Sequence, residues 1–216
     1  TNRNFNFRAT KDLVLTADDA ATIKLTVDDS LKTHGGSTNS TGELAFLSDS
    51  DDRRATITID KNVTINTNAK VWVGRTAVTK EVHATDVIIN GTINQQKNTD
   101  TNSYGIMQIQ SDKGSTVTLN GTIYLDWSLL VKGSTFTVTG TGLLGRSASS
   151  WHDTYVSVEK REDLGGKFIL DGGKTANLSA LAVNELSSAE LKNGANADFS
   201  QSATISSGAS LTISNS

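Results

Sequence analysis

The chain has no cysteine and no proline, and only 6% of its 216 residues are aromatic. Without cysteine it can form neither a disulfide framework nor a thiolate metal site. No apolar run approaches the roughly 20 residues that a membrane-spanning helix needs. The first residues, TNRNFNFRATKD, also lack the apolar segment of a signal peptide. These absences favour a soluble, mature fragment, and we expect no cofactor.

Charge of one sign is not concentrated anywhere in the chain. The net charge is −3, and the basic residues are scattered along the sequence. Nucleic-acid-binding proteins usually collect Lys and Arg in a stripe or patch, so a nucleic-acid ligand is not expected. An anionic ligand would have to find a local positive site on a slightly acidic protein.

One short phrase recurs while its surroundings do not. DVIINGTINQ begins at Asp86 and STVTLNGTIYLD begins at Ser115. Alternating apolar residues are typical of a strand with one buried face, and a small polar residue followed by Gly is typical of a turn. Asn-Gly also tolerates positive φ at little cost. Weaker copies follow in STFTVTGTGLL, GKFILDGGKTANL, AELKNGANADF and ATISSGASLTI.

The spacing of these copies indicates stacked repeats. The glycine of the phrase recurs at intervals of roughly 14 to 32 residues, a range typical of solenoids. In a β-helix the strands must stack rung on rung, whereas the connecting loops project outward and vary in length. We therefore expect an all-β, right-handed parallel β-helix (β-solenoid) with rungs over residues 55–216. Ile89 and Ile93 should stack on Leu119 and Ile123, with the Asn-Gly pairs at 90/91 and 120/121 in equivalent turns.

Residues 1–54 differ from the rest of the chain. They contain two short apolar stretches and an acidic, Gly/Ser-rich stretch, with no Asn-Gly pair. A solenoid needs a terminal cap, because its first rung would otherwise expose its core and its strand edge. We predict that residues 1–54 form an N-terminal cap, with a short helix around residues 18–25. The high Ser, Thr, Asn and Gly content also suits disorder, but the regular alternation argues against disorder in residues 55–216.

Enzymes that cleave polysaccharides commonly use the right-handed β-helix, so they are the alternative function. Pectate lyases carry their catalytic Arg in a motif that contains Pro, which this chain lacks. Of the ordered motifs of galacturonan hydrolases, only the first is matched, by Asn98-Thr99-Asp100; no paired Asp, Gly-His-Gly or Arg-Ile-Lys follows. Glycoside hydrolysis needs two carboxylates flanking one bond. The three Asp-Asp pairs, at residues 18/19, 28/29 and 51/52, all precede the predicted rungs.

Two further patterns have simpler explanations. SDSDDRR, residues 48–54, has clustered carboxylates but lacks the glycine and distal Glu of a calcium-binding EF-hand, so we expect a solvated acidic turn and no metal site. Thr-x-Thr pairs at 56/58 and 116/118 suggest a threonine ladder of the kind that binds ice. The rung DVIING between them has no such pair, and outward threonine is ordinary on a strand.

Two stretches break the rung pattern and concentrate the cationic and aromatic side chains: KVWVGRTAVTKEVH (residues 70–83) and LLGRSASSWHDTYVSVEKRED (residues 143–163). Aromatic faces stack on sugar rings, Arg and Lys pair with carboxylate or sulfate, and loops on a rigid scaffold commonly carry binding. Histidine gains charge as pH falls through about 6.5, which would strengthen binding to an anion. Trp72 and Trp127 are either core residues or binding residues. The candidate binding residues are Arg75, Lys80, His83, Arg146, Trp151 and His152.

A solenoid without Pro or Cys, rich in Thr and Asn and turning on Asn-Gly-Thr-Ile, resembles the pectate-lyase-like β-solenoid binding regions of serine-rich-repeat adhesins in lactobacilli and related Gram-positive bacteria. The resemblance covers residues 10–216 and rests on composition and rung style rather than on a diagnostic motif. It implies an extracellular, cell-wall-anchored protein that binds glycans, such as mucin or acidic pectin-type polysaccharide, without cleaving them. The passenger of a Gram-negative autotransporter has similar rungs and is a second alternative.

Overall fold

The structure, a computed structural model, describes residues 4–25, 43–50, 52–76, 79–96, 105–150 and 152–214. Every regular element in these ranges is a β-strand, and no helix that could cross a membrane occurs in them. Several residues singled out in the sequence lie outside the described ranges: Trp151, Asp51, the pair 28/29 and the triplet 98–100.

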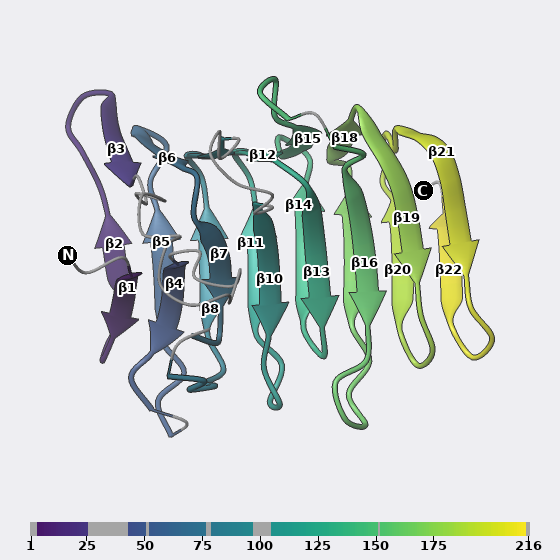
Figure 1. Ribbon diagram of the computed structural model, residues 1–216, viewed down its shortest axis with the longest axis horizontal. Coiled ribbons are helices and arrows are strands. Elements are labelled where there is room, and N and C mark those ends of the chain that lie inside the picture. Colours follow the sequence, from purple (N-terminus) through teal and green to yellow (C-terminus); the bar gives the residue numbers. More distant parts are fainter. Residues whose placement is uncertain are drawn as a thin grey trace, which may run out of the picture.

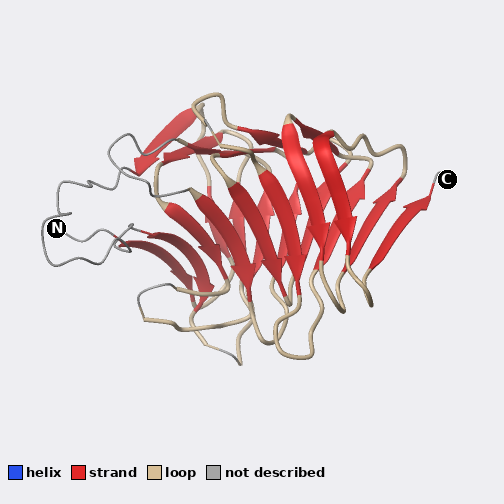
Figure 2. Ribbon diagram, turned by 45° about the vertical axis from the view of Figure 1, so that its right-hand side comes forward, coloured by secondary structure: helices blue, strands red, loops and turns tan. Residues whose placement is uncertain are grey.

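The strands form three parallel sheets that share one axis, and the chain visits the sheets in turn (Figures 1 and 2). Sheet A contains β1 (Asn4–Ala9), β4 (Glu43–Ser48), β7 (Lys70–Val73), β10 (Ile106–Gln110), β13 (Ser128–Lys132), β16 (Tyr155–Glu159), β19 (Leu178–Val183) and β21 (Phe199–Ile205). Sheet B contains β2 (Leu13–Leu15), β5 (Thr56–Ile59), β8 (Asp86–Ile89), β11 (Thr116–Leu119), β14 (Thr135–Thr139), β17 (Lys167–Asp171), β20 (Ser188–Lys192) and β22 (Ser210–Ser214). Sheet C contains β3 (Ala21–Leu25), β6 (Val63–Thr67), β9 (Thr92–Gln95), β12 (Thr122–Leu125), β15 (Leu143–Arg146) and β18 (Lys174–Ala176). The fold is the predicted parallel β-helix.

The repeated phrase stacks in register, as predicted. Leu119 of β11 pairs with Ile89 of β8, and Ile123 of β12 pairs with Ile93 of β9. All four side chains are fully buried in the core between the sheets. Because each strand alternates one inward and one outward residue, the apolar positions of successive rungs form continuous inner rows.

The Asn-Gly pairs occupy equivalent turns between sheets B and C, but the expected reason for the glycine is wrong. Neither Gly91 nor Gly121 has positive φ. A Cβ on Gly121 would instead lie 2.1 Å from the Gly91 carbonyl oxygen, and one on Gly91 would lie 2.2 Å from the Val63 carbonyl oxygen. Glycine is required because the backbones of adjacent rungs approach too closely for a side chain. Asn120 Nδ2 donates to Asn90 Oδ1 at 2.8 Å, which links the same turns.

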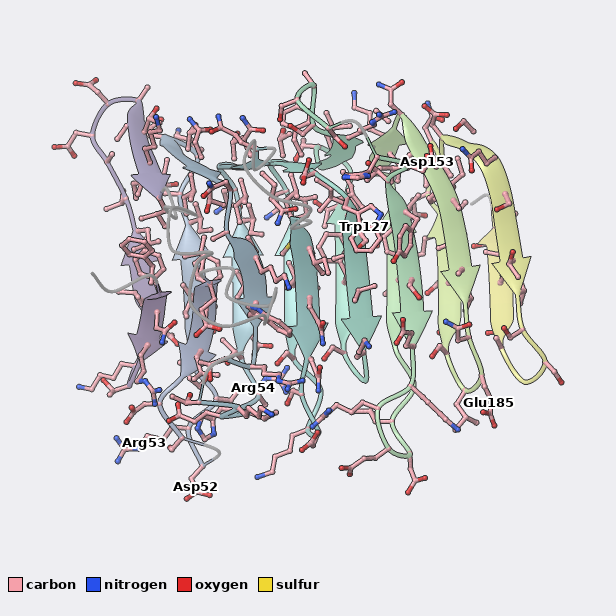
Figure 3. The ribbon with its side chains drawn as sticks, viewed as in Figure 1. Asp52, Arg53, Arg54, Trp127, Asp153 and Glu185 are labelled. Carbon is pink, nitrogen blue, oxygen red and sulfur yellow. The ribbon has the colours of Figure 1, made fainter. Side chains whose placement is uncertain are left out.

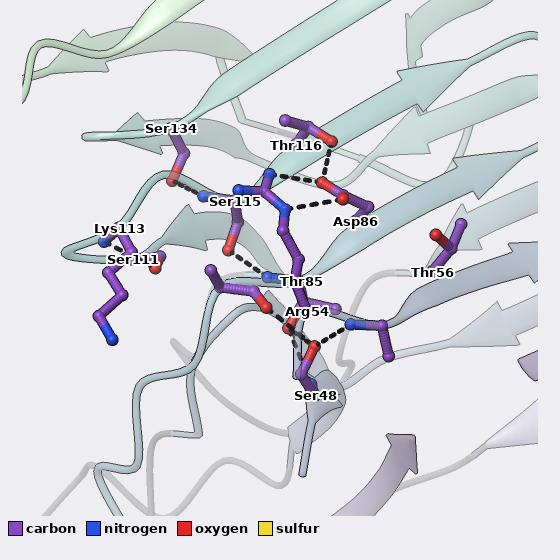
Figure 4. Close-up of polar contacts among 12 residues, drawn as sticks. Ser48, Arg54, Thr56, Thr85, Asp86, Ser111, Lys113, Ser115, Thr116 and Ser134 are labelled. Carbon is purple, nitrogen blue, oxygen red and sulfur yellow. Dashed lines mark hydrogen bonds and ion pairs between the residues drawn. The ribbon is translucent and has the colours of Figure 1, made fainter. Parts of the chain in front are cut away.

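At the corner between sheets A and B, buried hydroxyl groups accept hydrogen bonds from backbone N–H groups of the neighbouring rung (Figure 4). The Thr85 backbone N–H donates to Ser115 Oγ at 3.1 Å, and the Ser115 N–H donates to Ser134 Oγ at 3.3 Å. The Ser48 N–H donates to Thr85 Oγ1 at 2.8 Å. A buried N–H without a partner would cost about 1–3 kcal/mol, so these hydroxyls satisfy donors that the strands leave free.

The N-terminal segment joins the same three sheets, and the helix predicted there is absent. Residues 21–25 form strand β3, which pairs in parallel with β6. Ile23 alternates with exposed Thr22 and Lys24, so this stretch has the two-residue period of a strand rather than the period of a helix. Of residues 1–54, those in β1, β2, β3 and β4 supply the first strands of the solenoid.

On the outer face of sheet B the threonine rows are interrupted, as the sequence predicts. Thr56 and Thr58 of β5 are in register with Asp86 and Ile88 of β8, which are in turn in register with the threonines of β11. Asp86 forms an ion pair with Arg54 and accepts a hydrogen bond from Thr116 (Figure 4). The threonine array needed for an ordered ladder is therefore broken at β8.

We predict that Gly121→Ala lowers the free energy of unfolding by about 2 kcal/mol or more, because the added methyl group would meet backbone oxygen atoms that cannot move independently. Gly140→Ala is the matched control, since a Cβ there would meet nothing within 4 Å. It should change stability by less than about 0.5 kcal/mol. Urea denaturation of both variants measures the difference, and equal stabilities would contradict the role assigned to the close backbone approach.

Candidate functional site

The two irregular stretches of the sequence both border sheet A, but at opposite ends of its strands. Residues 74–85 leave the carboxyl end of β7, whereas residues 147–154 enter the amino end of β16. Figure 3 shows Trp127 and Asp153 at the upper end of the sheets, and Arg54 at the lower end, where β4 and β7 finish. The candidate residues therefore form two separate groups, which we call the hairpin cluster (Lys70, Trp72, Arg75, Lys80 and His83) and the aromatic cluster (Trp127, Arg146, His152 and Tyr155).

The hairpin cluster is built on a short antiparallel turn that follows β7. The Thr76 N–H donates to the Glu81 carbonyl at 3.0 Å, and the His83 N–H donates to the Gly74 carbonyl at 3.0 Å. Lys80 is exposed at this turn with φ +56°, a left-handed conformation uncommon for residues other than glycine. Arg8 forms an ion pair with Glu81, which fastens the turn to the first rung. The turn therefore holds Arg75 and His83 close to sheet A.

Arg75 lies beside an aromatic ring and has no carboxylate partner among the described residues. Its guanidinium carbon is 5.5 Å from the centroid of the Trp72 ring, within the range of a cation–π interaction. Its Nη1 donates to Gln110 Oε1 at 2.9 Å, and Gln110 is almost fully buried. The buried Nε atom of Arg75 and Nε1 of Trp72 have no hydrogen-bond acceptor. Two buried donors and a positive charge thus remain without a partner at this position.

Lys70 adds a second cation to the hairpin cluster. It lies two residues before Trp72 on β7, so both side chains point to the outer face of sheet A. Burial removes water from the ammonium group and lowers the pKa of Lys70. Glu43 of β4 is in register with Lys70, but no ion pair joins Lys70 to a carboxylate within the described part of the chain. Lys70 and Arg75 are therefore two cations near Trp72, one on the same strand face and one over the indole ring, and the described residues offer neither an ion pair.

The aromatic cluster joins side chains from two adjacent rungs. Trp127 precedes β13, Arg146 ends β15, His152 follows β15, and Tyr155 begins β16. The Trp127 ring contacts Tyr155 edge to face, with centroids 5.7 Å apart, and lies 6.3 Å from the His152 ring. Tyr155 begins β16 on the outer face, since the next residue, Val156, belongs to the core. All three rings are partly exposed. They form an apolar surface with polar edges at the amino end of β13 and β16.

Arg146 ends β15 and supports the loop that carries His152. Its Nη2 donates to the Ser150 carbonyl at 3.1 Å, and the His152 N–H donates to Ser150 Oγ at 3.3 Å. Ser150 Oγ also donates to the Asp126 carbonyl, which joins this loop to the preceding rung. Like Arg75, Arg146 is half-buried and bonded to neutral oxygen, so its charge is not neutralised.

Lys70, Arg75 and Arg146 differ from the other half-buried cations because they lack an ion pair. Where the structure describes a half-buried cation outside the two clusters, the cation has a carboxylate partner: Lys132 with Glu159, Arg161 with Asp112, Lys167 with Glu190, and Lys192 with Asp171. Lys70, Arg75 and Arg146 are also half-buried, but the described residues offer them no ion pair. Taking a charge out of water is costly unless it is paired, so an anionic ligand would stabilise these three positions.

The candidate binding residues predicted from the sequence include part of each cluster. Arg75 and His83 lie together in the hairpin cluster, with Lys80 at its exposed turn, and Arg146 and His152 lie together in the other. Trp151 lies outside the described residues. The sequence left Trp127 open between a core role and a binding role. Lys70 and Tyr155 were not among the candidates, although Lys70 and Trp72 share the two-residue spacing of one strand face. Among the described residues, no three His, Asp or Glu side chains are grouped as a metal site would require.

We predict that Lys70→Met raises the urea midpoint of unfolding at neutral pH. The unfolded chain binds the Lys70 proton more tightly than the folded chain does, because burial lowers the folded pKa. The charge therefore opposes folding below the folded pKa, and this penalty disappears as pH rises through the unfolded value near 10.4. The gain from Lys70→Met should shrink in that range. The matched control is Lys174→Met, an exposed lysine, and a gain of the same size there would contradict the role of burial.

No protein-family model, curated protein or solved structure matches the chain in sequence or fold comparisons. The functional assignment therefore rests on the two clusters and on the solenoid that positions them.

Proposed function

We propose that the protein binds acidic polysaccharide, of the mucin or pectin type, through the hairpin and aromatic clusters and does not cleave it. The observation that carries this proposal is the set of three half-buried cations without a carboxylate, Lys70, Arg75 and Arg146, each located beside exposed rings or their supporting loop. The other half-buried cations of the described chain are paired, so a ligand carboxylate or sulfate is the missing partner.

The chemistry of each cluster suits a sugar acid. The faces of Trp72, Trp127 and Tyr155 offer apolar surface for the C–H face of a sugar ring. Arg75 and Arg146 can bond carboxylate or sulfate oxygens through planar, multiple N–H donors. Because the clusters lie at opposite ends of the strands of sheet A, a polymer would engage them as separate subsites, and affinity would increase through simultaneous contacts.

Two described carboxylates, those of Asp126 and Asp153, lie next to the aromatic cluster in the sequence. Asp126, beside the aromatic cluster, is 1% exposed and accepts a hydrogen bond from the Gly105 N–H at 3.1 Å. Asp153 is exposed and accepts from Ser179 Oγ at 3.4 Å. A glycosidase needs one carboxylate on each side of the bond to be broken. We therefore propose a structural role for Asp126, because its buried carboxylate already accepts the Gly105 N–H.

The cellular setting is proposed from the resemblance to serine-rich-repeat adhesins. A binding region on an extended solenoid, carried on the surface of a bacterial cell, would meet host or plant glycans at high density. Weak affinity for each sugar is then sufficient, because many copies bind at the same time.

Binding should depend on the unpaired arginines. We predict measurable affinity for polygalacturonate or sulfated mucin glycans and none for a neutral glucan, with weaker binding at higher salt. Arg75→Ala and Arg146→Ala should each weaken binding roughly three- to tenfold. Arg161→Ala is the matched control, because this half-buried arginine already pairs with Asp112 and should leave affinity unchanged. Calorimetry can test the series; equal losses in all three variants would place the site elsewhere.

The histidines should add a pH dependence. Between about pH 7.5 and 4.5, imidazole groups gain positive charge, so binding to an anionic polymer should strengthen as pH falls. The double variant His83→Ala/His152→Ala should flatten this profile while retaining binding at pH 7.5. A flat profile in the unmodified protein, or the same slope in the variant, would remove these histidines from the site.

Incubation with polygalacturonate should yield no product. We expect neither the absorbance of unsaturated uronides nor new reducing ends, because the motifs of both enzyme classes are missing from the sequence. Turnover that survives repurification and is lost on a point mutation would show instead that the protein is a polysaccharide-cleaving enzyme.

A further inference from the structure

The chain contains three Asn-Gly pairs, at residues 90/91, 120/121 and 193/194, and the structure gives the third pair different surroundings from the first two. An asparagine before glycine loses its side-chain amide most easily, because glycine has no side chain to hinder attack by its own backbone nitrogen on the asparagine Cγ. Local conformation decides which pairs react, since that nitrogen must lose its proton to base and turn toward the side chain. The three pairs therefore form an internal comparison.

The first two pairs have their glycine nitrogens bonded within the stack of rungs. The Gly91 N–H donates to the Ile59 carbonyl at 3.2 Å, and the Gly121 N–H donates to the Ile89 carbonyl at 2.8 Å. These bonds join each turn to the preceding rung, and the backbones there are too close for a side chain on either glycine. The reacting nitrogen of each pair is thus engaged unless the rung opens locally.

The side chains of the first two pairs are also held. Asn120 Nδ2 donates to Asn90 Oδ1 at 2.8 Å, and Asn120 Oδ1 accepts from Thr139 Oγ1 at 2.6 Å. Both asparagines are half-buried. Turning either amide toward the following glycine would break bonds that link neighbouring rungs. Both the attacking atom and the attacked group are therefore constrained in these two turns.

The third pair forms an exposed turn directly after β20. Asn193 has φ +56° and Gly194 has φ +72°, the pair of positive values for which Asn-Gly turns are favoured. Both residues are exposed, and a Cβ on Gly194 would meet nothing within 4 Å. The Ala195 N–H closes the turn by donating to the Lys192 carbonyl at 3.2 Å, whereas the Gly194 N–H has no acceptor among the described residues. Solvent base can therefore reach the attacking nitrogen of this pair.

We propose that Asn193 is a site of spontaneous modification, where the side-chain amide is lost through a cyclic imide while Asn90 and Asn120 stay intact. The Gly194 nitrogen gives its proton to a solvent base and forms a bond to Cγ of Asn193. The Cγ–Nδ2 bond then breaks, and the amide nitrogen takes a proton from water and leaves as ammonia. Water opens the imide at either carbonyl group, which yields aspartate or isoaspartate. The only co-reactant is water.

The product changes the interactions around the turn. Asn193 Nδ2 donates to Asp171 Oδ1, and Lys192 Nζ lies 3.7 Å from Asp171 Oδ2. The reaction replaces this donor with a second carboxylate, which is ionised at neutral pH because its unperturbed pKa is about 3.9. Isoaspartate also lengthens the main chain in the turn that leads to Asn196, whose N–H donates to the Gly173 carbonyl at 3.0 Å. The modification therefore weakens the contact of this connection with the preceding rung.

Peptide mapping by mass spectrometry tests the proposal on the whole folded chain, incubated at mildly alkaline pH. The mass change from amide to carboxylate should appear at Asn193 at least about tenfold faster than at Asn90 or Asn120. The rate should rise with pH, because the attacking species is the deprotonated backbone nitrogen. A Glu-specific protease used at acidic pH cleaves after Glu190, whereas trypsin would cleave after Lys192 and leave the asparagine at a new amino terminus.

The unfolded chain is the matched control. In concentrated guanidinium chloride the rates at the three pairs should become similar, because all three share the same local sequence. Equal rates in the folded protein, or a rate ratio that unfolding leaves unchanged, would overturn the proposal. Neither glycan-binding cluster contains Asn193, so these outcomes do not depend on the proposed function.

Asn193→Asp tests the structural consequence separately, because it introduces one product directly. Hydrogen exchange of the Asn196 N–H should be faster in this variant than in the unmodified protein, while exchange of the Gly121 N–H should stay the same. Unchanged exchange at Asn196 both in this variant and in protein enriched in isoaspartate would refute the predicted weakening of the connection.

Discussion

Parallel pairing of each rung with the next is the constraint on which the rest of this molecule depends. Successive strands lie about 4.8 Å apart, so every inner position must pack on its equivalents one rung above and below. Ile89 on Leu119 and Ile93 on Ile123 are examples, and the same spacing forces glycine at 91 and 121 because two backbones meet there. The hydroxyls of Ser115 and Ser134 satisfy corner amides of the preceding rung in the same repeat. One spacing thus selects apolar, glycine and hydroxyl residues at different corners of each rung.

The connections between strands escape this constraint, and the cations without an ion pair lie in a connection or at a strand end: Lys70 begins β7, Arg75 follows β7 and Arg146 ends β15. Interior ion pairs such as Lys132–Glu159 link outward positions of adjacent strands, where each cation has a neighbour in register. Arg75 and Arg146 lie where the chain leaves or enters a sheet, and no register supplies a carboxylate there. Trp72 and the Trp127–Tyr155 pair lie at the same boundaries. The rigid scaffold holds these groups in place without neutralising them, which is the property a binding surface for acidic polymers requires.

The sequence predicted the parts of the structure that repeat. The alternation and the recurring Asn-Gly phrase predicted the parallel β-helix, the equivalent turns and the buried stacks. It did not predict why glycine stands in those turns, because close approach between rungs involves residues some thirty positions apart. The prediction of a helix at residues 18–25 was wrong. A short Asp-rich stretch with alternating apolar residues fits a helix or a strand, and pairing with the neighbouring strand selects the strand. The contact of Trp127 with Tyr155 was also not foreseen, because loops of unequal length hide which residues become neighbours on adjacent rungs.

The hydrogen bonds between rungs run along the long axis, and the first and last rungs lie at opposite ends of that axis (Figure 2). A mechanical load applied between these ends acts along the interstrand hydrogen bonds rather than across them. The bonds of one rung break before those of the next are loaded, so the terminal rungs peel away one after another at low force. Under tension the molecule extends gradually and releases chain in steps, and the interior rungs that carry the two clusters are among the last to open.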